Sequence, residues 1–294
     1  MSLIANLING LSLGSVYAII ALGYTMVYGI AKMLNFAHGD VIMVGAYISY
    51  VTTTSMNVPP ILSVLIAMVV CTVLGILIEG LAYRPLRKAT SLAVLITAIG
   101  VSYFLQNAAL LIWGSAPKSF RSLFASFKSI SLFGGKVVIT YEAIFTVIAC
   151  IVIMIGLTVF TKTSKIGKAM RAVSEDKDAA QLMGINVNFT ISVTFAIGSA
   201  LAAVAGVLLC SAYPVLVPTT GALPGIKAFT AAVFGGIGSI PGAMIGGILL
   251  GIIEIFSKAY ISTNLSDAIV FAVLIIVLLV KPTGLLGRKV NEKV

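Results

Sequence analysis

Long apolar runs separated by short polar segments dominate the chain. A helix that crosses the hydrocarbon core of a bilayer needs about 20 mainly apolar residues. The pattern therefore predicts an all-α polytopic integral membrane protein with eight or nine transmembrane helices, some short or broken, in a single domain over residues 1–294. The predicted spans are Leu3–Ile30, Val41–Thr54, Ile61–Tyr83, Leu92–Trp113, Ala143–Phe160, Phe189–Tyr213, Ile226–Gly238, Gly242–Phe256 and Ala268–Val280.

The composition favours the same class. Hydrophobic residues make up 60% of the chain and charged residues only 10%, whereas soluble domains carry roughly 25% charged residues. The net charge of +10 lies in short clusters between apolar runs, which is typical of loops that set membrane orientation and not of a nucleic-acid-binding surface. Isolated cysteines without metal-ligand spacing indicate neither a metal site nor a disulfide framework; they are Cys71, Cys150 and Cys210.

Basic residues are enriched in cytoplasmic loops, so their clusters predict the orientation. Three clusters are expected to be cytoplasmic: the turn near Pro85, residues 161–188 and the C-terminal tail. Counting back through the spans places the N-terminus outside, together with the longer loop at residues 114–140. That loop is basic although the count places it outside. The clusters comprise Arg84, Arg87, Lys88, Lys162, Lys165, Lys168, Arg171, Lys177, Lys281, Arg288, Lys289 and Lys293, and the outer loop contains Lys118, Arg121, Lys128 and Lys136.

The cytoplasmic loop at residues 161–188 is predicted to contain one short helix of about ten residues. Ser174 is a good N-cap, acidic residues follow it where the helix dipole favours them, and Gly184 can end the helix in the left-handed conformation. Such a helix either rests on the lipid surface or couples the chain to a cytoplasmic partner. The candidate coupling residues are Ser174, Glu175, Asp176, Asp178, Ala179, Ala180 and Gly184.

Polar residues interrupt two apolar runs near the N-terminus. Asn35, His38 and Asp40 follow the first predicted span within a few residues. They form either an ordinary cytoplasmic turn or a structured loop at the inner mouth of a transport pathway, since irregular backbone at membrane depth is tolerated only where protein or water satisfies it.

Glycines recur every four residues in the last third of the chain. Gly238, Gly242 and Gly246 have the spacing that lets helices approach closely in lipid. Pro241 interrupts any continuous helix here, and broken helices are common at transport sites. The region therefore predicts either tight packing or a broken helix, and its two spans are either full helices or half-helices.

Two acidic residues lie in or near apolar spans. Glu79 and Glu254 are functional candidates, because a buried acid in a membrane is costly. Each can alternatively reach the interface from a helix end, and Glu79 is expected to lie near Arg84.

Several functions lack their motifs. The sequence contains no G-x-x-x-x-G-K-[ST], so it has no P-loop for ATP, and it contains one histidine and no recognisable catalytic set. We expect no cofactor in this chain. An ion-coupled secondary transporter of small amphipathic solutes would need paired intramembrane charges. A membrane-embedded enzyme would need a polar cluster, for which only Asn35, His38 and Asp40 come close.

Several longer motifs together resemble the LivH-type permease of bacterial branched-chain amino acid ABC importers. The similarity extends from about residue 8 to the C-terminal part, but the outer loop matches no motif of that family. Within it, Asp178–Gly184 resembles the E-A-A-x-x-x-G loop by which importer permeases contact their ATPase, with Asp in place of Glu and no later Ile-x-Leu-Pro. The motifs are Gly14–Ile30, Asn35–Asp40, Tyr83–Arg87, Arg171–Asp176, Leu182–Asn186, Lys227–Gly247 and Pro282–Gly287.

The resemblance implies a permease subunit in the bacterial cytoplasmic (inner) membrane that forms half of a translocation pathway and works by alternating access. The implied partners are a second related permease subunit, two ATP-binding subunits that hydrolyse ATP, and a soluble substrate-binding protein. The implied substrate is a branched-chain or other hydrophobic amino acid. The exact amino acid, and whether the second permease is a paralogue or another copy of this chain, remain open.

Overall fold

The computed structural model describes residues 2–87, 89–124, 129–132 and 137–287. Lys88, Lys128, Lys136, Arg288, Lys289 and Lys293, which contribute to the predicted basic clusters, lie outside this part of the chain. The fold is almost entirely helical, so the predicted all-α class is confirmed. Its α-helices are α1 (Ser2–Ala31), α2 (His38–Thr54), α3 (Pro60–Ile78), α4 (Ser91–Trp113), α5 (Tyr141–Thr163), α6 (Lys165–Glu175), α7 (Lys177–Leu182), α8 (Val187–Ala212), α9 (Ala222–Gly235), α10 (Ile240–Tyr260) and α11 (Ser266–Val280).

Six helical stretches in the described residues are long and apolar enough to cross a membrane: α1, α3 with its extension to Leu86, α4, α5, α8 and α10. The helices α2, α9 and α11 are shorter. Large apolar side chains such as Phe104 and Leu111 on α4 and Val152 on α5 point outward. A soluble protein rarely exposes so much apolar surface, and these faces are therefore suited to lipid.

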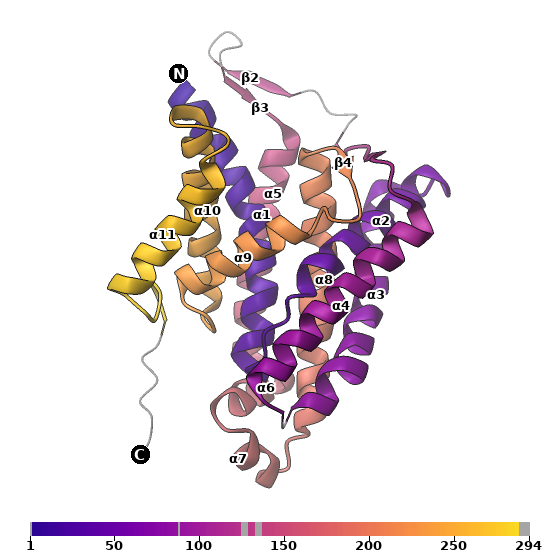
Figure 1. The fold of residues 1–294 in the computed structure, drawn as a ribbon, viewed down its shortest axis with the longest axis vertical. Coiled ribbons are helices and arrows are strands. Elements are labelled where there is room, and N and C mark those ends of the chain that lie inside the picture. The colour runs from indigo at the N-terminus through magenta and orange to yellow at the C-terminus, as the bar shows by residue number, and fades with distance from the viewer. Residues whose placement is uncertain (1, 88, 125–128, 133–136, 288–294) are drawn as a thin grey trace.

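The two ends of the bundle differ (Figure 1). The start of α1 lies at one end with the hairpin of β2 (Ile130–Leu132) and β3 (Val137–Ile139), while α6 and α7 lie at the opposite one. A second strand pair, β1 (Lys118–Ser119) with β4 (Val215–Leu216), is antiparallel. The sequence predicts the N-terminus and the loop at residues 114–140 outside and the loop at residues 161–188 in the cytoplasm. We therefore refer to these ends as outer and cytoplasmic.

Glycines set the closest helix contacts in the bundle. A β-carbon at Gly246 would lie 2.1 Å from the carbonyl oxygen of Ala231 on α9, and one at Gly242 would lie 2.5 Å from that of Gly235. On the same helix α10, Gly251 packs against Gly14 of α1. Gly242 and Gly246 thus pack between helices, as one of the two sequence interpretations predicts, while Gly238 lies in the turn between α9 and α10.

The glycine-rich region contains one short and one full-length helix. The chain turns at residues 236–239, where Gly236 and Gly238 have positive φ angles of 107° and 90°. Pro241 lies in the first turn of α10, where its missing N–H costs nothing. It therefore begins the second helix after the break, and α9 spans only 14 residues against 21 for α10.

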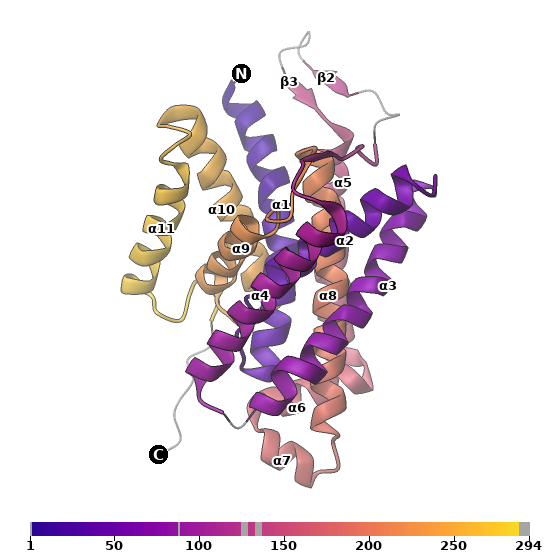
Figure 2. The ribbon, with the colours of Figure 1, turned by 45° about the vertical axis from the view of Figure 1, so that its right-hand side comes forward.

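Two segments of the chain turn back into the bundle before their next helix begins (Figure 2). Residues 32–37 lead from α1 to α2, and residues 213–221 lead from α8 to α9. The first turn of α2, directly after residues 32–37, meets the end of residues 213–221, where a β-carbon at Gly39 would lie 2.7 Å from the carbonyl oxygen of Gly221. We call them the first and second re-entrant segments.

Of the two interpretations of Asn35, His38 and Asp40, the ordinary cytoplasmic turn is wrong, and the structured loop at an inner mouth stays a prediction. These residues are only 4%, 1% and 2% exposed, and α2 already begins at His38. Their side chains have partners inside the bundle: Tyr83 donates to Asn35 and Gln106 donates to Asp40, both at 2.9 Å. The ring of His38 packs on Tyr24, with 4.6 Å between centroids. For Asn35 and Asp40 burial becomes tolerable because protein groups replace water, whereas Nε2 of His38 is buried without a hydrogen-bond partner.

Candidate coupling site at the cytoplasmic end

The cytoplasmic loop contains two helices instead of the single predicted one. The hydroxyl of Ser164 caps α6 by accepting from the N–H of Gly167. Ser174 lies in the last turn of α6 and donates to the carbonyl of Arg171 at 2.7 Å, and Glu175 is the last residue of that helix. The prediction that Ser174 is an N-cap is therefore wrong.

Asp176 is the N-cap of α7. Its carboxylate accepts from the N–H groups of Asp178 and Ala179, each at 2.9 Å. One carboxylate thus satisfies two of the four N–H groups that a helix start leaves unpaired. Asp178 lies in the first turn, where the helix dipole favours a negative charge.

Gly184 ends α7 as predicted. Its φ is +82°, and the N–H of Ile185 bonds back to the carbonyl of Ala180 at 3.0 Å. This pattern closes a helix with a left-handed residue that glycine adopts without strain. The chain can therefore reverse from α7 toward α8 within a few residues.

The C-terminal end of α7 and its C-cap Met183 expose large apolar side chains, although they lie outside the spanning helices. Leu182 and Met183 are 88% and 82% exposed, and Ala179 is also exposed. Ala180 instead is buried and packs in the core. The candidate coupling residue Ala180 therefore does not present a contact surface, because a six-residue helix needs an apolar position against its own protein.

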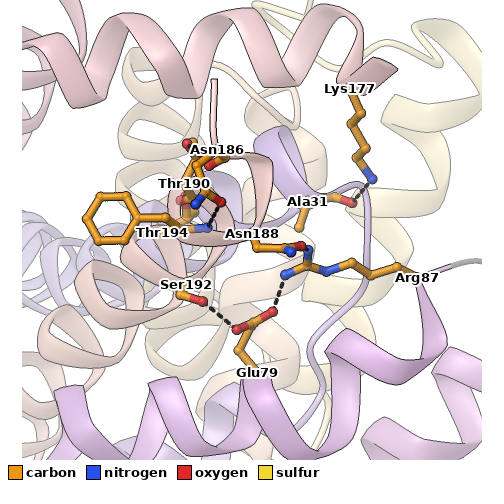
Figure 3. A network of polar contacts seen from close by, with 10 residues as sticks. Ala31, Glu79, Arg87, Lys177, Asn186, Asn188, Thr190, Ser192 and Thr194 are labelled. Carbon is orange, nitrogen blue, oxygen red and sulfur yellow. Dashed lines mark hydrogen bonds and ion pairs between the residues drawn. The ribbon is translucent and has the colours of Figure 1, made fainter. Parts of the chain in front are cut away.

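Lys177 connects α7 to the end of α1 (Figure 3). Its ammonium donates to the carbonyl oxygen of Ala31 at 2.7 Å. The last carbonyls of a helix lack internal partners and carry partial negative charge, so a cation there is favourable. Burial lowers the pKa of Lys177, and the neighbouring cations Arg87 and Lys32 lower it further. The first re-entrant segment begins immediately after Ala31.

Glu79 lies in the same region but pairs with a different arginine than predicted. A π-helical turn, η1 (Glu79–Tyr83), and a 3₁₀ turn, η2 (Arg84–Leu86), extend α3. They bring Arg87, and not Arg84, onto the buried carboxylate of Glu79. Ser192 of α8 donates to the same carboxylate at 2.6 Å, and Arg87 also contacts Asn188 (Figure 3).

The contacts of Glu79 and Tyr83 join the π-helical turn, the start of α8 and the first re-entrant segment. The π-helical turn holds the start of α8 through Glu79 and the first re-entrant segment through the bond from Tyr83 to Asn35. Because α8 follows α7 directly, movement of α7 would reach the first re-entrant segment by two routes, through Lys177 and through this turn. Sequence reasoning missed Lys177 and Arg87 as site residues, since both are ordinary members of a basic loop.

Glu254, the second candidate acid, lies far from this site, near the outer end of α10. It is buried and pairs with Lys227 at 2.9 Å and Lys258 at 2.6 Å. Sequence reasoning did not single out Lys227, although a lysine inside the predicted span Ile226–Gly238 is the signal that could have found it. No cluster of three metal-ligating His, Cys, Asp or Glu residues occurs in the part of the chain that the structure describes.

A bundle of helices long and apolar enough to span a membrane, with a capped helix pair at its cytoplasmic end, defines a multi-pass membrane protein. A family model described as branched-chain amino acid transport system / permease component matches residues 6–278. The chain belongs to this family.

Similar proteins cover nearly the whole chain. The high-affinity branched-chain amino acid transport system permease protein BraD of Pseudomonas aeruginosa is 48% identical, covering 98% of this chain and 97% of that protein. The corresponding permease LivH of Escherichia coli K12 is 48% identical, covering 97% and 96%. The solved structure of PsaBC from Streptococcus pneumoniae in complex with Fab shares the fold with a TM-score of 0.50 and 13% identity, covering 94% of this chain and 91% of that one.

Family membership decides between the functional alternatives. The chain is a transport permease subunit of an ATP-binding-cassette importer, not an enzyme and not an ion-coupled transporter. It works with ATP-binding and other transport components, in the bacterial cytoplasmic membrane.

Proposed function

We propose that the chain forms half of the pathway for branched-chain amino acids and is driven through α7. A second related permease subunit would complete the pathway, two ATP-binding subunits would power it, and a soluble binding protein would deliver leucine, isoleucine or valine. The similarity to the branched-chain amino acid permeases BraD and LivH supports the substrate class.

The exposed pair Leu182 and Met183 on α7 carries this proposal. Two large apolar side chains in the water at the cytoplasmic end are unfavourable unless a partner covers them. The acidic start of α7, with Asp176 and Asp178, argues against burial in an anionic inner leaflet. A groove in an ATP-binding subunit is the occupant that fits both features.

Lys177 and the π-helical turn would transmit the movement of α7. When the ATP-binding subunits close, α7 would shift with them and pull on Ala31 through Lys177. The first re-entrant segment follows Ala31 and leads into α2, whose Gly39 contacts Gly221 of the second re-entrant segment. Displacing this contact would switch the pathway between its outward-open and inward-open states.

Cross-linking tests the docking surface. The native cysteines Cys71, Cys150 and Cys210 are buried, so a cysteine introduced at Leu182 would be the accessible thiol among the described residues. We expect Leu182→Cys to cross-link to an ATP-binding subunit in the assembled complex, and the outer control Ile261→Cys not to. Labelling of Leu182→Cys by an impermeant reagent from outside intact cells would refute the proposal.

A further inference from the structure

A pocket of about 200 Å³ lies in the outer half of the molecule. Helices α1, α8 and α10 and the second re-entrant segment surround it, and Glu254 and Lys258 reach it from the last two turns of α10. The outer end of α10 lies beside the N-terminus (Figure 1). Sites for drug-sized ligands measure roughly 300–1,000 Å³, so this pocket suits a smaller molecule, of amino-acid size.

Charges of both signs line or support the pocket. The carboxylate of Glu254 accepts from the hydroxyl of Tyr17 at 2.8 Å and from Lys227 and Lys258. Lys227 also pairs with Asp267 at 2.7 Å. The cluster contains two cations and two anions and is neutral as a whole. Buried charges are tolerable only when paired in this way.

The two lysines are not equivalent. The side chain of Lys227 is 7% exposed and lies between two carboxylates, so it fixes α9 against α10 and α11. The side chain of Lys258 is 34% exposed, lines the pocket and reaches Glu254 from that side. Lys258 can therefore turn toward a ligand while Lys227 continues to neutralise Glu254.

The second re-entrant segment and the start of α9 form one wall of the pocket. Thr220 of the segment and Pro224 of α9 line it, and between them in sequence Gly221 packs against Gly39 of α2. Broken helices and irregular backbone inside the membrane typically surround transport sites. The pocket thus extends from the outer half toward the contact that α7 is proposed to control.

We infer that this pocket receives the zwitterionic head group of an α-amino acid. The substrate carboxylate binds Lys258, its ammonium binds Glu254, and its side chain packs against Leu13, Leu209 and Val215. Insertion replaces one ion pair by two and leaves no charge unpaired. An amine or a carboxylic acid alone would leave the cluster with one unbalanced charge, which is unfavourable at a largely buried site. The inference rests on the proposed import function.

Protection of an introduced thiol tests this site. Val215→Cys places an accessible thiol on the pocket wall. In the assembled complex without binding protein, L-leucine at about ten times its Kd should slow labelling about tenfold, because only unoccupied pockets react. The probes 3-methylbutylamine and 4-methylpentanoate, which each lack one charge, should protect far less.

Control variants separate binding from folding. In the Val215→Cys background, Lys258→Met should abolish protection and Lys258→Arg should retain it, while Ile261→Cys on the outer surface should label at the same rate with and without leucine. ATP-driven leucine uptake without any protection by leucine would overturn the pocket and leave the proposed function intact. Protection without ATP-driven uptake would support the pocket and refute the proposed function.

Discussion

At the scale of single residues, Lys177 is the most specific contact between the cytoplasmic loop and the membrane helices. Lys177→Met removes the donor to Ala31 and the favourable charge at the end of α1, an interaction worth about 0.3–1 kcal/mol at exposed helix ends. We expect the complex to assemble and hydrolyse ATP, while the number of leucine molecules imported per ATP falls. Parallel assays of uptake and phosphate release measure this ratio.

Lys177→Arg is the matched variant, because it keeps a charged donor at the same position. It should retain most of the coupling. An unchanged ratio of uptake to hydrolysis in Lys177→Met would mean that α7 acts on the bundle without this contact.

At the scale of elements, the contact between α9 and α10 depends on glycine. Gly246→Leu would force a side chain against the backbone of Ala231, where even a β-carbon would lie 2.1 Å away. Such overpacking typically costs about 1–3 kcal/mol, so we expect reduced thermal stability and weaker assembly of the purified permease. Thermal unfolding in detergent measures the difference.

Gly100→Leu provides the control on α4. A β-carbon at Gly100 meets no atom within 4 Å, and this glycine is exposed on a lipid-suited face. It should unfold close to the wild-type temperature. Equal stability of the two leucine variants would show that α9 and α10 do not pack as described.

Sequence patterns predicted the long spanning helices because apolar length is a local property. The span Leu3–Ile30 became Ser2–Ala31, and the left-handed end at Gly184 was found because it depends on one residue type. The re-entrant segments escaped prediction. For His38 and Asp40 the sequence left an ordinary turn and a structured loop both open, because their partners Tyr24 and Gln106 lie on other helices.

The sequence predicted a capped helix in the cytoplasmic loop, but it placed the N-cap two residues too early, at Ser174 instead of Asp176. Ser174 and Asp176 are both good N-caps, and only the fold shows that α6 continues through Ser174. In the same way the sequence could not decide whether Arg84 or Arg87 pairs with Glu79. The π-helical turn brings Arg87 onto that carboxylate.

At the scale of the whole molecule, the central claim is that the ATP-binding subunits drive import by contacting the exposed side chains of Leu182 and Met183 at the end of α7. ATP-dependent uptake of leucine into proteoliposomes, containing the complete complex and the loaded binding protein, tests it most directly. The double variant Leu182→Asp, Met183→Asp changes only exposed side chains, so its unfolding free energy should stay within about 0.5 kcal/mol of wild type. Coupling through α7 predicts rapid uptake with the wild-type chain and almost none with this variant. Wild-type uptake by the folded double variant would contradict it.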